Sequence, residues 1–226
     1  MNKVFILCFL FPWLVMAVQF SAGVGTEFPI GWSLDGKAAF PDQNIYTRIR
    51  VGKFISAFTD SMNDLAESQG YYNSATGKIV SESLKDATHL EVALGYQQDL
   101  KSGWLTDIAY SSISGDGQIT GAVIAEAVSG ITLPGGSNIY DIEGKLENLI
   151  LRVGYQWELQ PQMVLTLTGG LMKPLSSDTQ LDRDVTGPIQ QAILDAANRE
   201  LDEYMKETLE NDVVIPLIGL TYMYGF

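Results

Sequence analysis

The last fourteen residues of the chain, VVIPLIGLTYMYGF, constrain its fold more than any other stretch. Counted back from the carboxyl end, every second residue is apolar or aromatic, and the residues between them are mostly small. The apolar and aromatic set is Ile218, Leu220, Tyr222, Tyr224 and Phe226. A period of two places the two sets on opposite faces of a β-strand. A strand with lipid on one face and a crowded barrel interior on the other has this pattern.

The closing hexapeptide TYMYGF resembles the final strand of small Gram-negative outer-membrane β-barrel proteins. Proteins of that class typically end in an aromatic residue with alternating apolar residues before it. The resemblance implies that residues 218–226 form a signal for the barrel-assembly machinery and that the folded chain lies in outer-membrane lipid. From these residues alone, a core strand of a soluble β-sandwich is the alternative.

The amino end has the pattern of a secretory signal peptide. Lys3 supplies a positive charge, an apolar run extends from Val4 to Val15, and Val15-Met16-Ala17 provides residues that a signal peptidase can read. We predict a signal peptide at residues 1–17 and a barrel domain at residues 18–226. An uncleaved anchor is the alternative, but the run is shorter than the about 20 residues that span a bilayer.

Composition excludes several classes of function. The chain has 27 acidic and 14 basic residues, a formal net charge of −13, which argues against a nucleic-acid partner. The single cysteine, Cys8, lies within the predicted signal peptide, so the mature chain has no disulfide, thiolate metal site or cysteine nucleophile. No calcium-loop spacing is present. We therefore expect no cofactor and no bound metal.

The alternation of the final strand recurs in seven earlier stretches. The eight expected strands are residues 18–28, 32–40, 45–54, 89–97, 104–111, 148–158, 163–172 and 213–226. Short connections (PDQN, QDLKSG and QPQ) join them at one end, whereas three of the four at the other end are long. Outer-membrane barrels have short periplasmic turns and longer extracellular loops. We predict an all-β fold, an eight-stranded antiparallel up-and-down transmembrane β-barrel, as a monomer.

Two of the long connections, residues 115–141 and 176–212, have helical signals of different strength. The first includes GAVIAEAVSG, a candidate short helix. The second predicts an amphipathic helix in a loop at about residues 185–211, with Pro188 in its first turn. Its apolar stripe is Ile189, Ile193, Ala197, Leu201, Tyr204, Met205 and Leu209. We expect this stripe to pack on the other loops, because an apolar stripe of this size would favour aggregation if it were exposed to water. An interaction arm or a lid over the barrel mouth is the alternative.

Aromatic side chains on the outward faces gather near the short connections. This set is Phe40, Tyr96, Trp104, Tyr155 and Trp157. Aromatic belts occur where a barrel crosses the interface between lipid and water. We predict a periplasmic aromatic girdle at this end.

The inward faces of the expected strands carry formal charges. They are Glu27, Asp35, Lys37, Arg48, Arg50, Glu91, Asp107 and Arg152. Buried charges must be paired or hydrated, and eight strands enclose just enough space for side chains to fill. We predict that these residues form an ion-pair network that fills the lumen, with Arg48 and Arg50 close to acidic partners on the neighbouring strands. A narrow conduit for small solutes is the alternative.

The only histidine, His89, is expected near the outer end of its strand, close to Glu91. Some small outer-membrane barrels are lipid A acyltransferases or deacylases that use histidine with serine and an acidic residue, and Ser83 or Ser111 could serve as the nucleophile. No local motif matches those enzymes, so we assign no catalytic residue. The leading interpretation is a non-enzymatic protein with structural or recognition roles carried by its long loops.

Overall fold

The computed structural model describes residues 18–68, 70, 73–129, 138–182, 195, 198–207, 209 and 213–225. The predicted signal peptide and Phe226 lie outside the described residues, and so do Pro188, Ile189, Ile193 and Ala197 of the predicted helix.

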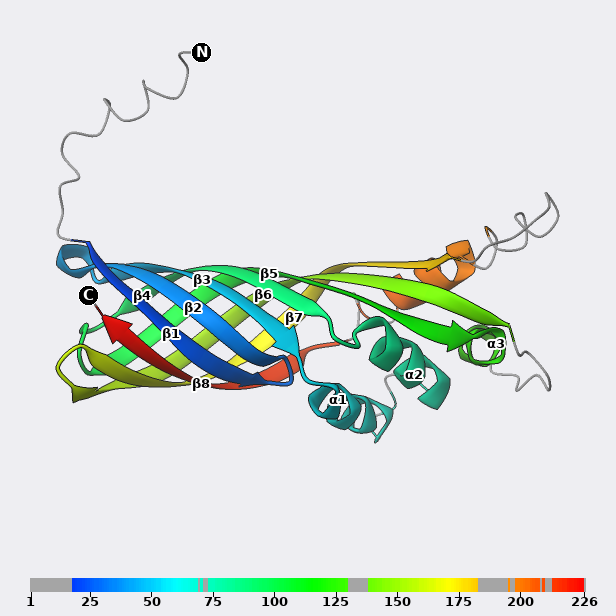
Figure 1. The fold of residues 1–226 in the computed structure, drawn as a ribbon, viewed down its shortest axis with the longest axis horizontal. Helices are drawn as coiled ribbons and strands as arrows, with labels where there is room; N and C mark the ends of the chain where they lie inside the picture. The colour runs from blue at the N-terminus through cyan, green and yellow to red at the C-terminus, as the bar shows by residue number, and fades with distance from the viewer. Residues whose placement is uncertain are drawn as a thin grey trace, which may run out of the picture.

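Eight strands close into one barrel, with neighbours in sequence order (Figure 1). They are β1 (Gln19–Phe28), β2 (Gly31–Phe40), β3 (Ile45–Phe54), β4 (Thr88–Gln97), β5 (Gly103–Thr120), β6 (Ile139–Gln160), β7 (Met163–Asp182) and β8 (Ile215–Gly225). Every neighbouring pair is antiparallel, including the β1–β8 pair that closes the ring. The predicted eight-stranded up-and-down barrel is confirmed.

The connections divide by length as the sequence indicates. One end has the short turn η1 (Pro41–Gln43) and the tight returns from β4 to β5 and from β6 to β7, and β8 ends on the same side (Figure 1). The opposite end has α1 (Ser56–Ser68), α2 (Ser74–Ser83), α3 (Gly121–Ser129) and a helical stretch at residues 198–207. No helix within the described ranges combines the length and hydropathy needed to cross a bilayer.

Three strands are much longer than predicted. β5 continues to Thr120, β6 begins at Ile139 and β7 continues to Asp182, so the expected connections at residues 115–141 and 176–212 are shorter than we predicted. Residues 113–120, 139–147 and 173–182 form a three-stranded sheet that projects beyond the barrel (Figure 1). We call this sheet the outer extension.

On β5 and β6, the inward and outward positions continue in phase from the barrel into the outer extension, but their chemistry is exchanged. On β5, Ile108 faces outward and Asp107 inward within the barrel, whereas Asp116 faces outward and Ile119 inward in the extension. On β6, Leu151 and Glu143 are both outward. Because the apolar set changes face, the alternation of hydrophobicity is interrupted in the sequence, and the expected strands end too early there.

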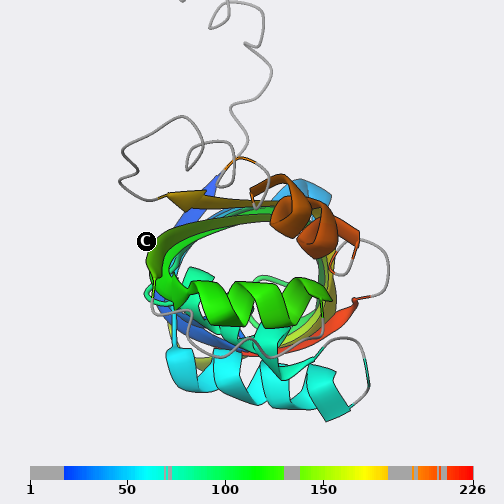
Figure 2. The ribbon, with the colours of Figure 1, turned by 90° about the vertical axis from the view of Figure 1, so that its right-hand side faces the viewer.

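Helices cover the inner face of the outer extension and the barrel mouth. Figure 2 looks along the barrel from the end with the long connections and shows α3 lying across the opening. One apolar core joins these helices to the sheet, and it includes Ile79, Val80, Ile113, Ile124, Ile142, Leu181, Leu201 and Met205. From the predicted helix stripe, Leu201 and Met205 are buried in this core, and Tyr204 and Leu209 pack against it.

The β7 edge of the outer extension is covered, which protects it from pairing with another chain. On the β7 edge, the Asn198 side chain accepts a hydrogen bond from the Leu181 amide and donates one to the Leu181 carbonyl. Asp202 accepts from the Thr179 amide at 3.3 Å. On the inner face of β5, α2 approaches so closely that a Cβ on Gly117 would lie 2.0 Å from the Glu82 carbonyl oxygen. Glycine is required there because no side chain fits.

Candidate functional site

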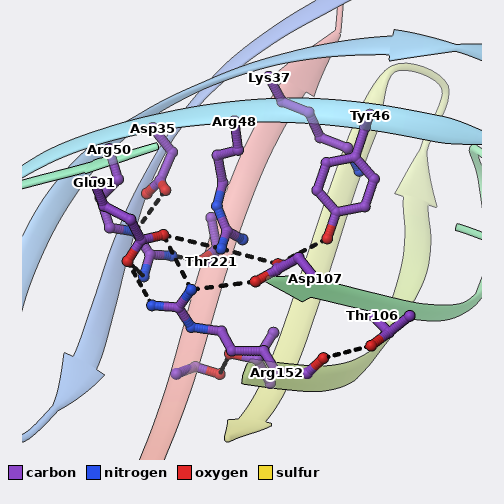
Figure 3. A network of polar contacts seen from close by, with 12 residues as sticks. Asp35, Lys37, Tyr46, Arg48, Arg50, Glu91, Thr106, Asp107, Arg152 and Thr221 are labelled. Carbon is purple, nitrogen blue, oxygen red and sulfur yellow. Dashed lines mark hydrogen bonds and ion pairs between the residues drawn. The ribbon is translucent and has the colours of Figure 1, made fainter. Parts of the chain in front are cut away.

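The middle of the barrel holds a buried cluster of charged side chains (Figure 3). Its members are Glu27, Asp35, Arg48, Arg50, Glu91, Asp107 and Arg152, each at most 5% exposed. They come from the inward positions of β1 to β6, where strict alternation aims every second side chain at the barrel axis. We call these seven residues the lumen network.

Arg152 lies at the centre of the lumen network and reaches three carboxylates on three strands. Its Nε and Nη2 donate to the two oxygens of Glu27, at 2.8 and 2.7 Å. Nη2 also donates to Glu91 Oε2 at 2.6 Å, and Nη1 donates to Asp107 Oδ1 at 3.3 Å. Since Arg152 is on β6 and Glu27 is on β1, this side chain crosses the lumen and ties opposite walls together.

The other two arginines join the remaining strands to the same centre. Arg50 Nε donates to Asp35 Oδ1 at 2.7 Å and Nη1 donates to Glu27 Oε2 at 3.0 Å. Arg48 Nη2 lies 3.2 Å from Glu91 Oε1 and 3.0 Å from Asp107 Oδ2. The structure therefore brings Arg48 and Arg50 to acidic partners on neighbouring strands.

Small inward residues make room for these long side chains. A Cβ on Gly219 would lie 3.0 Å from Glu27 Oε2, and one on Gly170 would lie 2.9 Å from Arg152 Cγ. At Gly95, it would overlap the ring of Tyr46. The barrel interior is thus filled by large residues that face glycines on neighbouring strands, as expected for a barrel of this width.

Lys37 is the one predicted member that does not join the ion pairs. Its Nζ lies 4.2 Å from the ring centroid of Tyr46 and 3.5 Å from Gln156 Oε1, and within the described part of the chain it makes no ion pair. Lys37 is inward on β2, one step nearer the short connections than Asp35, and its register partner on β3 is another cation, Arg48, whereas the partner of Asp35 is Arg50.

Our prediction from charge alone missed three uncharged members. Tyr46 donates its hydroxyl to Asp107 Oδ2 at 2.8 Å, Ser33 donates to Asp35 Oδ2 at 2.9 Å, and Thr221 accepts from Arg50 Nη2 at 3.4 Å. All three are inward positions of their strands. The same alternation that identified the charges would have found them had hydrogen-bonding side chains been included.

The two ends of the lumen, on either side of the lumen network along the barrel axis, are filled differently. On the outer side lies the apolar core of the outer extension, which includes Ile113 and Ile150, both fully buried. On the side of the short connections, a vestibule of about 440 Å³ has both polar and apolar walls, which include Lys37, Gln156, Leu100 and Met223. The network and the apolar core together separate this vestibule from the outer face.

The residues considered for catalysis are buried and are not arranged as a nucleophile and base. His89 and Ser111 have no exposed surface, and Ser83 donates to the Val80 carbonyl. Neither ring nitrogen of His89 has a hydrogen-bond partner among the described residues, although Nε2 lies 3.7 Å from Glu91 Oε2. No serine in the described ranges therefore contacts His89 as nucleophilic catalysis requires.

The predicted girdle residues lie beside the short connections. Tyr96, Trp104 and Trp157 are exposed, whereas Phe40 and Tyr155 are half-buried. The Tyr155 ring packs against both tryptophans, with centroids 5.4 Å from Trp104 and 4.9 Å from Trp157. This packing explains why Tyr155 is half-buried. The three aromatic rings lie together on the outer wall of the barrel.

The exterior of the barrel is apolar above the girdle. Exposed side chains on it include Leu34, Ile49, Val92, Leu94, Ile108, Leu151, Val153, Leu167, Leu171, Ile218, Leu220 and Tyr222. An apolar surface that encircles a closed barrel is stable only against lipid. The chain is a membrane-spanning barrel of the outer-membrane type. Ile218, Leu220, Tyr222 and Tyr224 are all on this exterior, and their role in assembly stays a prediction.

Among the described residues, no group of three or more His, Cys, Asp or Glu side chains is placed to hold a metal ion. No protein-family model matches the sequence, and no curated protein matches it. Among solved structures, the chain is similar to a major outer membrane protein from Thermus thermophilus, with 14% identity, coverage of 93% of this chain and 100% of that chain, and a TM-score of 0.49. It is also similar to CarO of Acinetobacter baumannii, with 8% identity, coverage of 93% and 99%, and a TM-score of 0.29.

Proposed function

We propose that this protein is a non-enzymatic outer-membrane protein in which a closed barrel supports a surface-exposed recognition unit, the outer extension with its covering helices. One observation carries the proposal. The inward residues that would line a pore are paired across it, while β5, β6 and β7 continue past the lipid-facing band and form a second packed body.

The ion pairs support a closed lumen. A pathway for solutes through the barrel centre would have to separate Arg152 from Glu27 and Glu91, which are 2.7 and 2.6 Å away. All three side chains are almost fully buried, so their separation would leave charges without partners in a medium of low dielectric constant. That energetic cost opposes the opening of a pathway for solutes through the barrel.

The outer extension has the features of a rigid recognition surface. Its helices and sheet share one apolar core, and its outward face has Asp116, Glu143, Lys145, Asp178 and Asp182 in register on three paired strands. Side chains on paired strands keep a more precise geometry than those on loops. The acidic excess of this face disfavours polyanionic partners.

The vestibule on the side of the short connections favours the alternative function, a channel for small solutes. Single-channel recording in planar bilayers tests this alternative. We expect the full chain to give no stable conductance steps. Arg152→Ala, which removes the central cation, is the matched variant and should conduct if it folds, as judged by heat-modifiable gel migration. Stable steps from the unmodified protein would overturn the closed lumen.

Site-specific photo-cross-linking in intact cells tests the recognition role. A photoreactive amino acid at Gln118 or Gln180, both on the outward face of the outer extension, should give specific adducts with a surface component. The same amino acid at Thr106, on the lipid-facing part of β5, is the control. If neither outer position gives an adduct that the control lacks, the outer extension is not a recognition surface.

A further inference from the structure

Strands β7 and β8 separate near the outer rim of the barrel. Their last paired residues are Met172 and Ile215, yet β7 continues to Asp182 alongside β6. Pro174 and Pro216 lie on either side of the separation. Proline has no amide hydrogen to donate to a neighbouring strand, so it suits a strand edge.

A β-bulge increases this separation. Glu147 pairs with Ser176 and Asn148 pairs with Pro174, so Leu175 has no partner on β6. A bulge bends its strand and increases the local twist. The outer half of β7 is thereby directed away from β8, and we call the resulting gap the β7–β8 seam.

An apolar cavity of about 80 Å³ lies inside the β7–β8 seam. Its walls include Val80 of α2, Leu84 directly after α2, Met205 and Leu209 of the helical loop, and Val213. Two charged residues, Lys145 and Asp178, also line it, and they face each other as register partners on β6 and β7. The cavity therefore has no net formal charge in its lining and does not select an ion.

The cavity is continuous with the lipid-facing exterior. Val214 and Pro216 line it and also face outward, and Val214 is 48% exposed. Leu175, on the other side of the β7–β8 seam, is 49% exposed. At the corresponding height on β6 the outward residues are Lys145 and Glu147. The apolar exterior thus reaches the buried core at this seam.

We propose that the β7–β8 seam binds the end of an acyl chain from an outer-leaflet lipid. The chain has the required chemistry, because it is apolar and uncharged and reaches the protein laterally through the bilayer. An engineered apolar cavity of about 150 Å³ admits benzene, so a cavity of about half that size suits the terminal methylene groups of one chain. A water-soluble ligand would have to cross the charged outward face of the outer extension.

Photo-cross-linking with a labelled lipid tests the inference. The full chain is reconstituted in phospholipid vesicles that contain a phospholipid with a diazirine at the tip of one acyl chain. We expect adducts on Met205, Leu209 or Val213, which line the cavity and are shielded from the bulk bilayer. Val214→Trp closes the mouth of the seam and should abolish these adducts. Val92→Trp, at an exposed valine on β4, is the matched control and should retain them.

Heat-modifiable gel migration verifies that each variant is folded. If Val214→Trp does not fold, Leu175→Trp, on the opposite side of the seam, is the second variant that closes its mouth. Adducts confined to exterior residues such as Ile218, or cavity adducts that persist when the mouth is closed, would overturn the proposal. Labelling of the cavity by a diazirine fatty acid in detergent, without labelling by the phospholipid in vesicles, would also overturn it and identify a free fatty acid as the ligand.

Discussion

The membrane-spanning part of the barrel and the outer extension share three strands, β5 to β7, which have opposite chemistry in the two regions. In the barrel, β6 directs Arg152 inward and Leu151 outward. Ten residues earlier, the same strand directs Ile142 inward and Asp141 outward. The backbone alternation is common to both regions. Lipid around the barrel and water around the outer extension decide whether apolar or charged residues occupy the outward face.

The comparison shows two ways to fill an interior. Inside the barrel, charged side chains are tolerated because three arginines and four carboxylates form ion pairs with one another. Inside the outer extension, water covers the outward face, so apolar side chains gain free energy from burial. A substitution in one region should therefore fail for a different reason than a substitution in the other.

The bulge at Leu175 is what allows β7 to serve both regions. Below it, even-numbered residues such as Thr168 and Met172 face inward, and above it odd-numbered residues such as Thr179 and Leu181 do. If the same sequence alternated strictly through this point, with no bulge, Asp178 and Asp182 would face the apolar core, because a shift of one residue exchanges the faces of a strand.

Insertion of one alanine between Ser177 and Asp178 should have the largest effect. It exchanges the faces of residues 178–182 and directs Asp178 and Asp182 into the apolar core, at a cost of several kcal/mol for each buried charge. We expect residues 139–147 and 173–182 to become protease-sensitive while the barrel keeps its heat-modifiable migration. Leu175→Ala retains the bulge and is the control. Equal protection in both variants would contradict this role of the bulge.

Arg152→Met should destabilise the barrel by about 4 kcal/mol, because Glu27, Glu91 and Asp107 lose a common buried partner. Urea unfolding in lipid vesicles, followed by tryptophan fluorescence, measures the change. Lys37→Met is the matched control. It removes a cation–π contact and should cost about 1 kcal/mol. Similar losses of stability in the two variants would mean that the ion pairs do not stabilise the barrel interior more than the contacts of Lys37 do.

Leu201→Ala should destabilise the outer extension by about 3 kcal/mol through loss of a fully buried side chain from its core. Hydrogen exchange should become faster for amides of the outer extension and remain unchanged for β1 to β3. Faster exchange throughout the barrel would show that the two regions unfold as one unit, and so would remove the distinction between them.

Asn198→Ala should have the smallest effect, about 1 kcal/mol, since it removes two hydrogen bonds at the β7 edge and leaves the apolar core intact. Hydrogen exchange at the Leu181 amide measures it directly. Exchange at the Ile142 amide, on the central strand of the outer extension, is the internal control and should not change. No change at Leu181 would show that the helix is not needed to cover this edge.

Prediction from sequence succeeded where one physical environment applied over a whole strand. For β3, lipid on one side and the lumen on the other produce an unbroken alternation, so both its bounds and the inward positions of Arg48 and Arg50 could be predicted. It failed on β5 to β7, where the environment changes along the strand. Lys37 was grouped with the ion pairs because alternation defines the face of a residue and not its neighbour across the strand, which for Lys37 is another cation, Arg48.

The sequence by itself determined the number of strands, the side of each residue and the presence of balanced charges on the inward faces, because these follow from local periodicity. The tertiary structure alone decided which charges meet, where β7 and β8 separate, and how three strands continue beyond the membrane. Those properties depend on register between distant segments: Arg152 and Glu27 are far apart in the chain and meet only because the barrel closes.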